Sequence, residues 1–313
     1  MPAIRTAGLT KRYGHDVYAV DDLSLTVEEG EVFGFLGPNG AGKSTTIDVL
    51  LDYVRPTAGT ARVLGYDAQR EAEAIHQRVG ILPDGYSLYD RLSGRDHVNF
   101  AIDLKDASDD PDAILDRVGL DAKAAARPAG TYSKGMSQRL ALGMALVGDP
   151  DLLVLDEPSS GLDPDGIRDI REITREHAVD GGTVFFSSHV LSQVEAVCDR
   201  VGILKNGRLV AVDTIDGLRE AVGTGSTISL TVDDPPTGLT VAGLEDVTDL
   251  HIEGDVVRAT CTDPTAKVAV IDAVRAAGSA VLDVETHEPS LEELFTEYTH
   301  ADEPAVTVSE VDR

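Results

Sequence analysis

A glycine-rich stretch at residues 37–45 constrains this chain more than any other feature. It has the form G-x-x-x-x-G-K-[ST], follows an apolar run at 32–36 and precedes the apolar positions of a helix at 47–51. Glycines in such a turn let successive backbone N–H groups face one phosphate, and the start of the helix adds partial positive charge. The pattern predicts a strand, a phosphate-binding loop and a helix in succession.

Each residue of this loop has an expected role. We expect Lys43 to reach the β- and γ-phosphates of a nucleotide and the Ser44 hydroxyl to hold Mg²⁺. The other expected nucleotide-binding residues of the loop are Gly37, Pro38, Asn39, Gly40, Ala41, Gly42 and Thr45. A glycine-rich turn with an incidental lysine is the alternative, which the flanking strand and helix disfavour.

A second motif lies where another apolar strand ends. Residues 152–155 are apolar and lead directly into Asp156, Glu157 and Pro158. The carboxyl ends of parallel strands meet at one edge of a sheet, so Asp156 should lie beside the phosphate loop and hold the magnesium shell. Glu157 should then polarise the attacking water as a general base. Taken alone, the motif also fits a solvated charge pair after a strand.

Together with four further motifs in chain order, these motifs resemble those of the nucleotide-binding subunits of ABC transporters. The resemblance covers about residues 3–220. Tyr13 matches the aromatic residue that stacks on adenine, and residues 132–139 match the family signature usually written L-S-G-G-Q. Residues 159–163 match the loop that connects two sites across a dimer, and His189 matches the switch histidine at the γ-phosphate.

The resemblance implies an α/β fold of the P-loop NTPase class. A parallel-sheet core, an antiparallel β subdomain and a helical insert at about residues 83–147 are expected. It also implies in-line hydrolysis of the γ-phosphate of ATP with Mg²⁺, in which Glu157, His189 and Lys43 are the catalytic residues.

The resemblance further implies partners. Two copies, or one copy and a related subunit, are expected to close on two ATP molecules, with Ser133, Gly135 and Asp163 contacting the ATP held by the other subunit. A separate integral membrane permease is the other expected partner. Residues 86–89 and Leu92 should lie at the groove that receives its coupling helix, and plain packing is the alternative for these side chains.

Three side chains depart from the family pattern. The signature carries Lys134 and Met136 where glycine and glutamine are usual. Lys134 either adds a charge near the phosphates or is solvated. Asp84 takes the place of a glutamine that touches Mg²⁺ or the attacking water. An aspartate has suitable chemistry but a shorter side chain, so Asp84 is grouped with Ser44 and Asp156 as a candidate metal ligand whose direct contact stays open.

The charge balance of the chain bears on its expected partners and on the salt concentration in which it works. The chain has 55 acidic and 27 basic residues, a net charge of −28. Such a surface repels nucleic-acid phosphates, so nucleic acid is not an expected partner. We expect a salt-loaded cytoplasm, as in halophiles, because salt would screen the self-repulsion. The start of the chain lacks a secretory pattern and no apolar run spans ~20 residues, so we expect a cytoplasmic protein, peripheral on the inner face of the cell membrane.

The pattern of the remaining sequence predicts the order of elements. Expected strands are 4–9, 17–20, 23–27, 79–82, 152–155 and 183–187, with a hairpin over 201–212 turning at Asn206-Gly207. Expected helices are 98–104, 111–118, 137–147, 165–178 and 191–198. The limits predicted for the domains are 1–222 for the ATPase domain, 223–300 for a small α+β accessory domain, and 301–313 for a disordered acidic tail.

The accessory domain refines the expected subfamily. It should contain strands at 228–232, 256–261 and 281–284, a helix at 266–276 and a last helix capped by Ser290 and Glu293. Residues 287–295 resemble the closing segment of cassettes that serve ABC-2-type exporters. The expected function is therefore ATP-driven export. A soluble ABC ATPase uncoupled from transport and a regulatory module without turnover remain the alternatives, whereas the absence of N-K-x-D argues against a GTPase.

Overall fold

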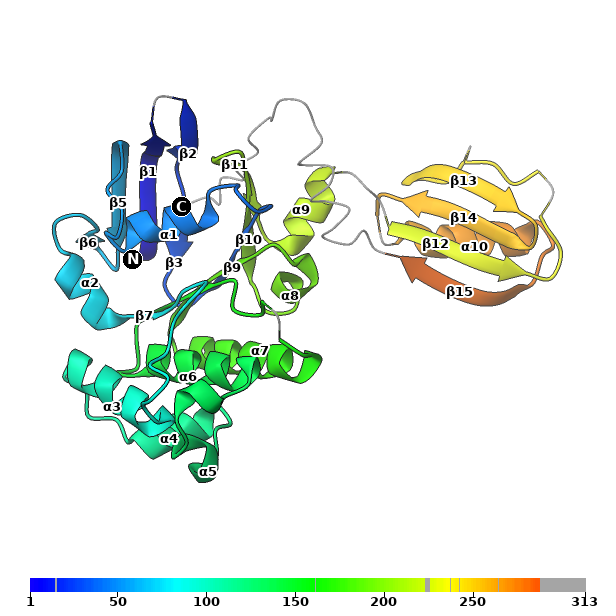
Figure 1. Cartoon of the computed structure of the whole chain (residues 1–313). Helices are drawn as coiled ribbons and strands as arrows, with labels where there is room; N and C mark the ends of the chain where they lie inside the picture. Colours follow the sequence, from blue (N-terminus) through cyan, green and yellow to red (C-terminus); the bar gives the residue numbers. More distant parts are fainter. Residues whose placement is uncertain are drawn as a thin grey trace. The chain divides into compact units, whose positions relative to one another are not determined.

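The computed structural model describes residues 1–14, 16–160, 162–222, 226–236, 238–241, 243–263 and 265–287. The chain forms two compact units, the first ending at Asp213 and the second beginning at Thr214 (Figure 1). A linker is expected at 223–226; its residues 223–225, the helix after Ser290 and the acidic tail lie outside the described residues, whereas Ser226 begins a strand. The predicted domain limits at residues 222 and 300 remain predictions.

The first unit is built on a six-stranded sheet in the order β11-β10-β4-β9-β8-β7. Its strands are β4 (Val32–Leu36), β7 (Val79–Leu82), β8 (Leu152–Asp156), β9 (Thr183–Ser188), β10 (Arg200–Lys205) and β11 (Arg208–Asp213). All neighbours are parallel except the β10–β11 hairpin. That hairpin turns at Asn206 and Gly207, whose φ angles of 50° and 81° fit a primed turn and confirm the expected hairpin.

A second, antiparallel sheet belongs to the same unit. It consists of β1 (Pro2–Tyr13), β2 (Val17–Leu23), β3 (Thr26–Glu28), β5 (Ala58–Val63) and β6 (Tyr66–Asp67). The prediction of one strand over 23–27 is wrong, because the chain leaves β2 at Leu23 and re-enters the sheet at Thr26. The Thr6 hydroxyl explains the break: it donates to Leu23 O at 3.0 Å and accepts from Leu25 N at 2.9 Å.

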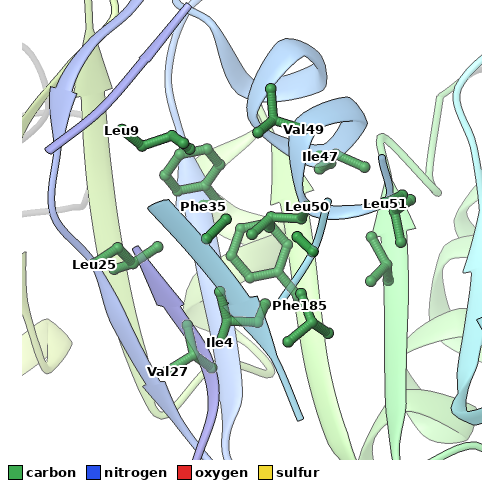
Figure 2. Packing of buried hydrophobic residues seen from close by; sticks show 14 of the residues in the cluster. Ile4, Leu9, Leu25, Val27, Phe35, Ile47, Val49, Leu50, Leu51 and Phe185 are labelled. Carbon is green, nitrogen blue, oxygen red and sulfur yellow. The ribbon is translucent and has the colours of Figure 1, made fainter. Parts of the chain in front are cut away.

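The core of this unit joins the two sheets through aromatic side chains. Phe185 of β9 stacks on Phe33 with ring centroids 5.9 Å apart and lies 5.2 Å from the ring of Phe35. Figure 2 shows Phe35 and Phe185 between Ile4 and Leu9 of β1, Leu25 of the segment between β2 and β3, and the apolar side chains of α1. The helix α1 (Lys43–Leu50) is therefore anchored on the sheet directly behind the glycine-rich loop.

Further helices of the first unit follow α1 along the chain. They are α2 (Ala72–Arg78), α3 (Gly94–Lys105), α4 (Pro111–Arg117), α5 (Ala122–Ala125), α6 (Lys134–Leu146), α7 (Pro164–Val179) and α8 (Leu191–Glu195), with a 3₁₀ turn at Ala129–Thr131. Figure 1 shows α3, α4, α5 and α6 grouped at one end of the first unit, away from β1 and β2. This group is the helical insert that the sequence predicts between the strands β7 and β8.

The second unit is a separate α+β structure. It contains α9 (Ile215–Val222) and an antiparallel sheet in the order β13-β14-β12-β15. The strands are β12 (Ser226–Val232), β13 (Val247–Glu253), β14 (Val256–Cys261) and β15 (Val281–His287). The helix α10 (Ala266–Ala276) buries Val270 and Val274 against the apolar side chains of this sheet. The fold class expected from the sequence is confirmed.

Candidate active site

Three neighbouring strands of the parallel sheet bring the candidate residues to one edge. In the sheet register Asp156 at the end of β8 pairs with Ser187 of β9, and Ser188 of β9 pairs with Leu36 at the end of β4. The glycine-rich loop follows β4 immediately, so the loop and Asp156 flank the end of β9. The predicted proximity of the two motifs is thus a consequence of strand order.

At two of its glycines the glycine-rich loop approaches neighbouring backbone so closely that a side chain is excluded. Gly42 has φ of 110°, and a Cβ atom there would lie 2.1 Å from Ala19 O. A Cβ at Gly37 would lie 2.6 Å from Leu204 O. Gly42 is also the N-cap of α1 and offers no side-chain cap, so the first N–H groups of the helix stay available for oxygen atoms of a ligand. The loop therefore fits a phosphate group.

Lys43, Glu157 and His189 form one connected group. Lys43 Nζ donates to Gly37 O at 2.7 Å and lies 3.2 Å from Glu157 Oε1. His189 Nδ1 lies 2.7 Å from Glu157 Oε2. Lys43 and Glu157 are only 6% and 11% exposed, whereas His189 is 46% exposed. A buried base thus stands between a fixed cation and a histidine that solvent reaches.

The backbone holds Glu157 in a conformation that few residues adopt. Its φ angle is 49°, in the left-handed region, and its N–H donates to Ser187 O and Ser187 Oγ at 3.2 and 3.1 Å. Its buried Oε1 has no aligned hydrogen bond despite the nearby Lys43. Strain and an unsatisfied carboxylate oxygen are typical of functional sites. The loop after β8 is therefore shaped for the position of this side chain.

Asp156 lies beside this group in a buried environment. Burial raises the pKa of its carboxyl, the hydroxyls of Ser187 and Ser44 partly offset that rise, and the charges of Asp84 and Glu157 add to it. Ser187 Oγ donates to Asp156 Oδ1 at 2.5 Å. The sequence analysis did not identify Ser187, although a serine near the end of a buried strand, two residues before His189, is a polar residue that needs a partner.

The oxygen donors at this edge fit Mg²⁺. Asp156 and Ser44 offer a carboxylate and a hydroxyl near the phosphate loop, and Mg²⁺ prefers one or two such ligands completed by phosphate oxygens and water. In the described part of the chain, no group of three or more His, Cys, Asp or Glu residues could hold a metal ion. The arrangement therefore suits a metal that enters with a nucleotide.

The predicted signature and loop residues cap helices. Ser133 is the N-cap of α6 and accepts from Met136 N at 3.2 Å. Asp163 is the N-cap of α7 and accepts from Gly166 N at 2.9 Å. Gln138 in α6 donates to Pro158 O at 2.7 Å, which ties the signature helix to the loop after Asp156. Sequence reasoning gave Gln138 no such role.

Two of the three residues that depart from the family pattern, Asp84 and Lys134, line one cavity. A cavity of 420 Å³ lies between the loop after β7, the start of α6 and the end of β8. Asp84 and Lys134 line it together with Asp156 and Glu157. Tyr13 lies apart from this group at the end of β1, 44% exposed, with Lys11 Nζ 5.0 Å from its ring centroid.

The fold and this site define a P-loop ATPase. Comparison with known proteins identifies the family within that class. The ABC transporter family model matches residues 20–160. The daunorubicin resistance ATP-binding protein DrrA3 of Streptomyces coeruleorubidus is 34% identical over 96% of each chain. A fluoroquinolones export ATP-binding protein of Mycobacterium tuberculosis is 39% identical over 70% of this chain and 73% of its own.

A solved structure of an ATP-binding subunit of an ABC transporter shares the fold. It matches with a TM-score of 0.65 and 29% identity over 71% of this chain and 93% of its own. The chain belongs to the ABC transporter ATP-binding proteins, so it is a transport-coupled ATPase. In its described part, none of the helices is long and apolar enough to cross a membrane.

Proposed function

We propose that this chain hydrolyses ATP with Mg²⁺ to power export through a separate membrane permease, as one subunit of an ATP-closed dimer. The arrangement of Lys43, Glu157 and His189 at the end of the sheet supports the proposal most directly. It unites a cation for the γ-phosphate, a buried base for the attacking water and a polar side chain that solvent reaches.

The chemistry follows from the position of each group. Backbone N–H groups from Gly40 to Thr45 hold the phosphates, and Lys43 leaves Glu157 to bind the γ-phosphate. The carboxylate of Glu157 then polarises a water molecule. His189, which lies at the Glu157 oxygen that Lys43 does not approach, contacts the γ-phosphate. Ser44 and Asp156 would hold Mg²⁺, which when bound stabilises charge on the phosphate oxygens.

The proposed dimer completes the site. Ser133 and Gly135 lie at the first turn of α6, where free N–H groups and the helix dipole favour an anion. We assign them, with Asp163, to the ATP held by the other subunit. Tyr13 is assigned to adenine, because its half-exposed ring at the end of β1 is accessible for stacking.

Export is proposed on the basis of the relatives. One of them is named for fluoroquinolones export and another for daunorubicin resistance. The second unit of this chain is included in the alignment with the daunorubicin resistance protein, since that alignment spans 96% of both chains. We place the protein on the inner face of the cell membrane, where the proposed permease would hold it. We assign it no nucleic-acid partner, because its net charge of −28 repels nucleic-acid phosphates.

An apolar groove beside β7 is the proposed docking surface for the permease. It has a volume of 560 Å³ and runs along Val79–Ile81, at the edge of the sheet, where β7 pairs with β8 alone among the described strands. Tyr53, Phe100 and Leu104 line it and are 58%, 50% and 69% exposed. Exposed apolar side chains gathered in a groove favour a helix with apolar side chains as partner.

The side chains predicted for docking lie near a different cavity. Tyr86 and Leu88 line the 420 Å³ cavity beside Asp156. Tyr89 and Leu92 are 66% and 38% exposed. Tyr89 N also donates to His97 Nε2 at 2.9 Å, which fixes this loop to α3. Their part in docking stays a prediction, and the groove beside β7 is an additional surface for the same partner.

Capture from native membranes tests the proposal. Tagged protein carrying Glu157→Gln should retain a multi-span membrane protein in high salt with ATP. Adding Leu104→Glu should release that protein, whereas Val179→Glu, at an exposed apolar position on α7, should not. If the ATP-bound dimer retains soluble partners alone, the function moves to a soluble ATPase uncoupled from transport.

A further inference from the structure

The cavity beside Asp156 contains an unusual balance of charge. Of the described residues that line it, Asp84, Asp90, Asp156 and Glu157 are acidic and Lys134 is the one cation. Asp84 reaches it from the loop after β7, and Lys134 reaches it from the first position of α6. Two segments that are far apart in sequence therefore contribute residues of opposite charge to one cavity.

Each of these two charges is unfavourable in its own local setting. Lys134 follows the N-cap Ser133, and the first turn of α6 has no acidic residue. A cation at this end of a helix opposes the helix dipole. Asp84 is a carboxylate close enough to Asp156 for the charges to repel. A local conflict of this kind at a functional site calls for a compensating contact.

We propose that Asp84 and Lys134 are positioning residues that pair across this cavity when nucleotide binds. The pair would join the loop after β7 to the signature helix of the same subunit, at the cavity that Glu157 also lines. In the described structure Lys134 forms no ion pair with Asp84. The contact therefore requires the start of α6 to approach the loop, and the cavity of 420 Å³ between them leaves room for that movement.

The pairing has a consequence for substrate binding. In the proposed pair Asp84 neutralises the charge of Lys134, so the pair alters the net charge of the cavity little. It acts on the site through the position of α6, and loss of either partner removes that link. The inference rests on the proposed function, which Lys43→Ala tests separately, since that variant should weaken ATP binding itself whether or not Asp84 and Lys134 pair.

A double-mutant cycle tests the pair. Asp84→Asn and Lys134→Met should each weaken binding of a fluorescent ATP analogue and turnover by about fivefold, and the double variant should lose little more than either single variant. The exchange Asp84→Lys with Lys134→Asp should recover part of the loss. Thermal unfolding of every variant checks that the fold is intact.

Asp90 provides the matched control because its carboxylate lines the same cavity. The cycle of Asp90→Asn with Lys134→Met should be additive. Additive losses for Asp84 and Lys134, failure of the exchange, or coupling to Asp90 in place of Asp84 would each overturn the pair. So would a rise in the Mg²⁺ requirement with Asp84→Asn that Lys134→Met does not share, because Asp84 would then be a metal ligand.

Discussion

At the scale of single residues, Glu157 carries the sharpest prediction. Its carboxylate is buried between Lys43 and His189 and its backbone is strained. Glu157→Gln keeps the size and shape of the side chain and its ability to form hydrogen bonds, but it removes the base. ATP should therefore still bind, while hydrolysis should fall by about 10³-fold, which corresponds to ~4 kcal/mol of barrier. Single-turnover phosphate release measures this loss, with Glu172→Gln on the exposed face of α7 as control. Near-normal release would remove Glu157 from the chemistry.

Gly42 carries a prediction of a different kind, because its lack of a side chain is what matters. A Cβ there would lie 2.1 Å from Ala19 O at a φ of 110°. Gly42→Ala should cost about 3 kcal/mol of stability and at least tenfold in ATP affinity. Gly65→Ala is the control: φ is also positive at 82°, but among the described residues nothing beyond the chain neighbours lies within 4 Å of the Cβ position, so the cost should be about 1 kcal/mol with unchanged affinity. Equal losses in both variants would contradict the steric explanation.

At the scale of elements, the helix caps separate structural from catalytic roles. Asp163 Oδ1 accepts from Gly166 N at the start of α7, and asparagine caps helices as well as aspartate does. Asp163→Ala should therefore lower stability by about 1 kcal/mol, or roughly 3 °C in Tm, whereas Asp163→Asn should leave it unchanged. If Asp163→Asn still reduces turnover of the dimer, the carboxylate acts on the partner's ATP. A loss of stability in both variants would show a role beyond the cap.

The elements also show what the sequence could and could not predict. The strand Val32–Leu36 and the helix Ala266–Ala276 were predictable to the residue, because turn residues bound their apolar patterns. The strands Ala58–Val63 and Val247–Glu253 were not predicted, since small residues in the first and exposed polar residues in the second obscure the alternation. The site followed from motif spacing, but the contacts made by Ser187 and Gln138 depend on which strands and helices become neighbours, which spacing does not encode.

At the scale of the whole molecule, the net charge of −28 should make stability depend on salt. Repulsion among exposed carboxylates acts over a Debye length of ~10 Å at 0.1 M salt and ~3 Å at 1 M. Unfolding by urea should therefore require at least about 1 kcal/mol more free energy in 2 M KCl than in 0.1 M KCl, or roughly 3 °C in Tm. Circular dichroism at both salt concentrations measures the difference.

A charge variant distinguishes screening from a general effect of concentrated salt on burial. Asp103, Asp116, Glu176 and Asp272 are exposed, so replacing them by asparagine or glutamine removes four negative charges and takes the net charge from −28 to −24. If repulsion is the cause, the variant should be more stable in 0.1 M KCl and gain less from 2 M KCl. An unchanged salt response would assign the effect to salt exclusion from the surface. Full stability of the parent protein in 0.1 M KCl would contradict adaptation to a salt-loaded cytoplasm.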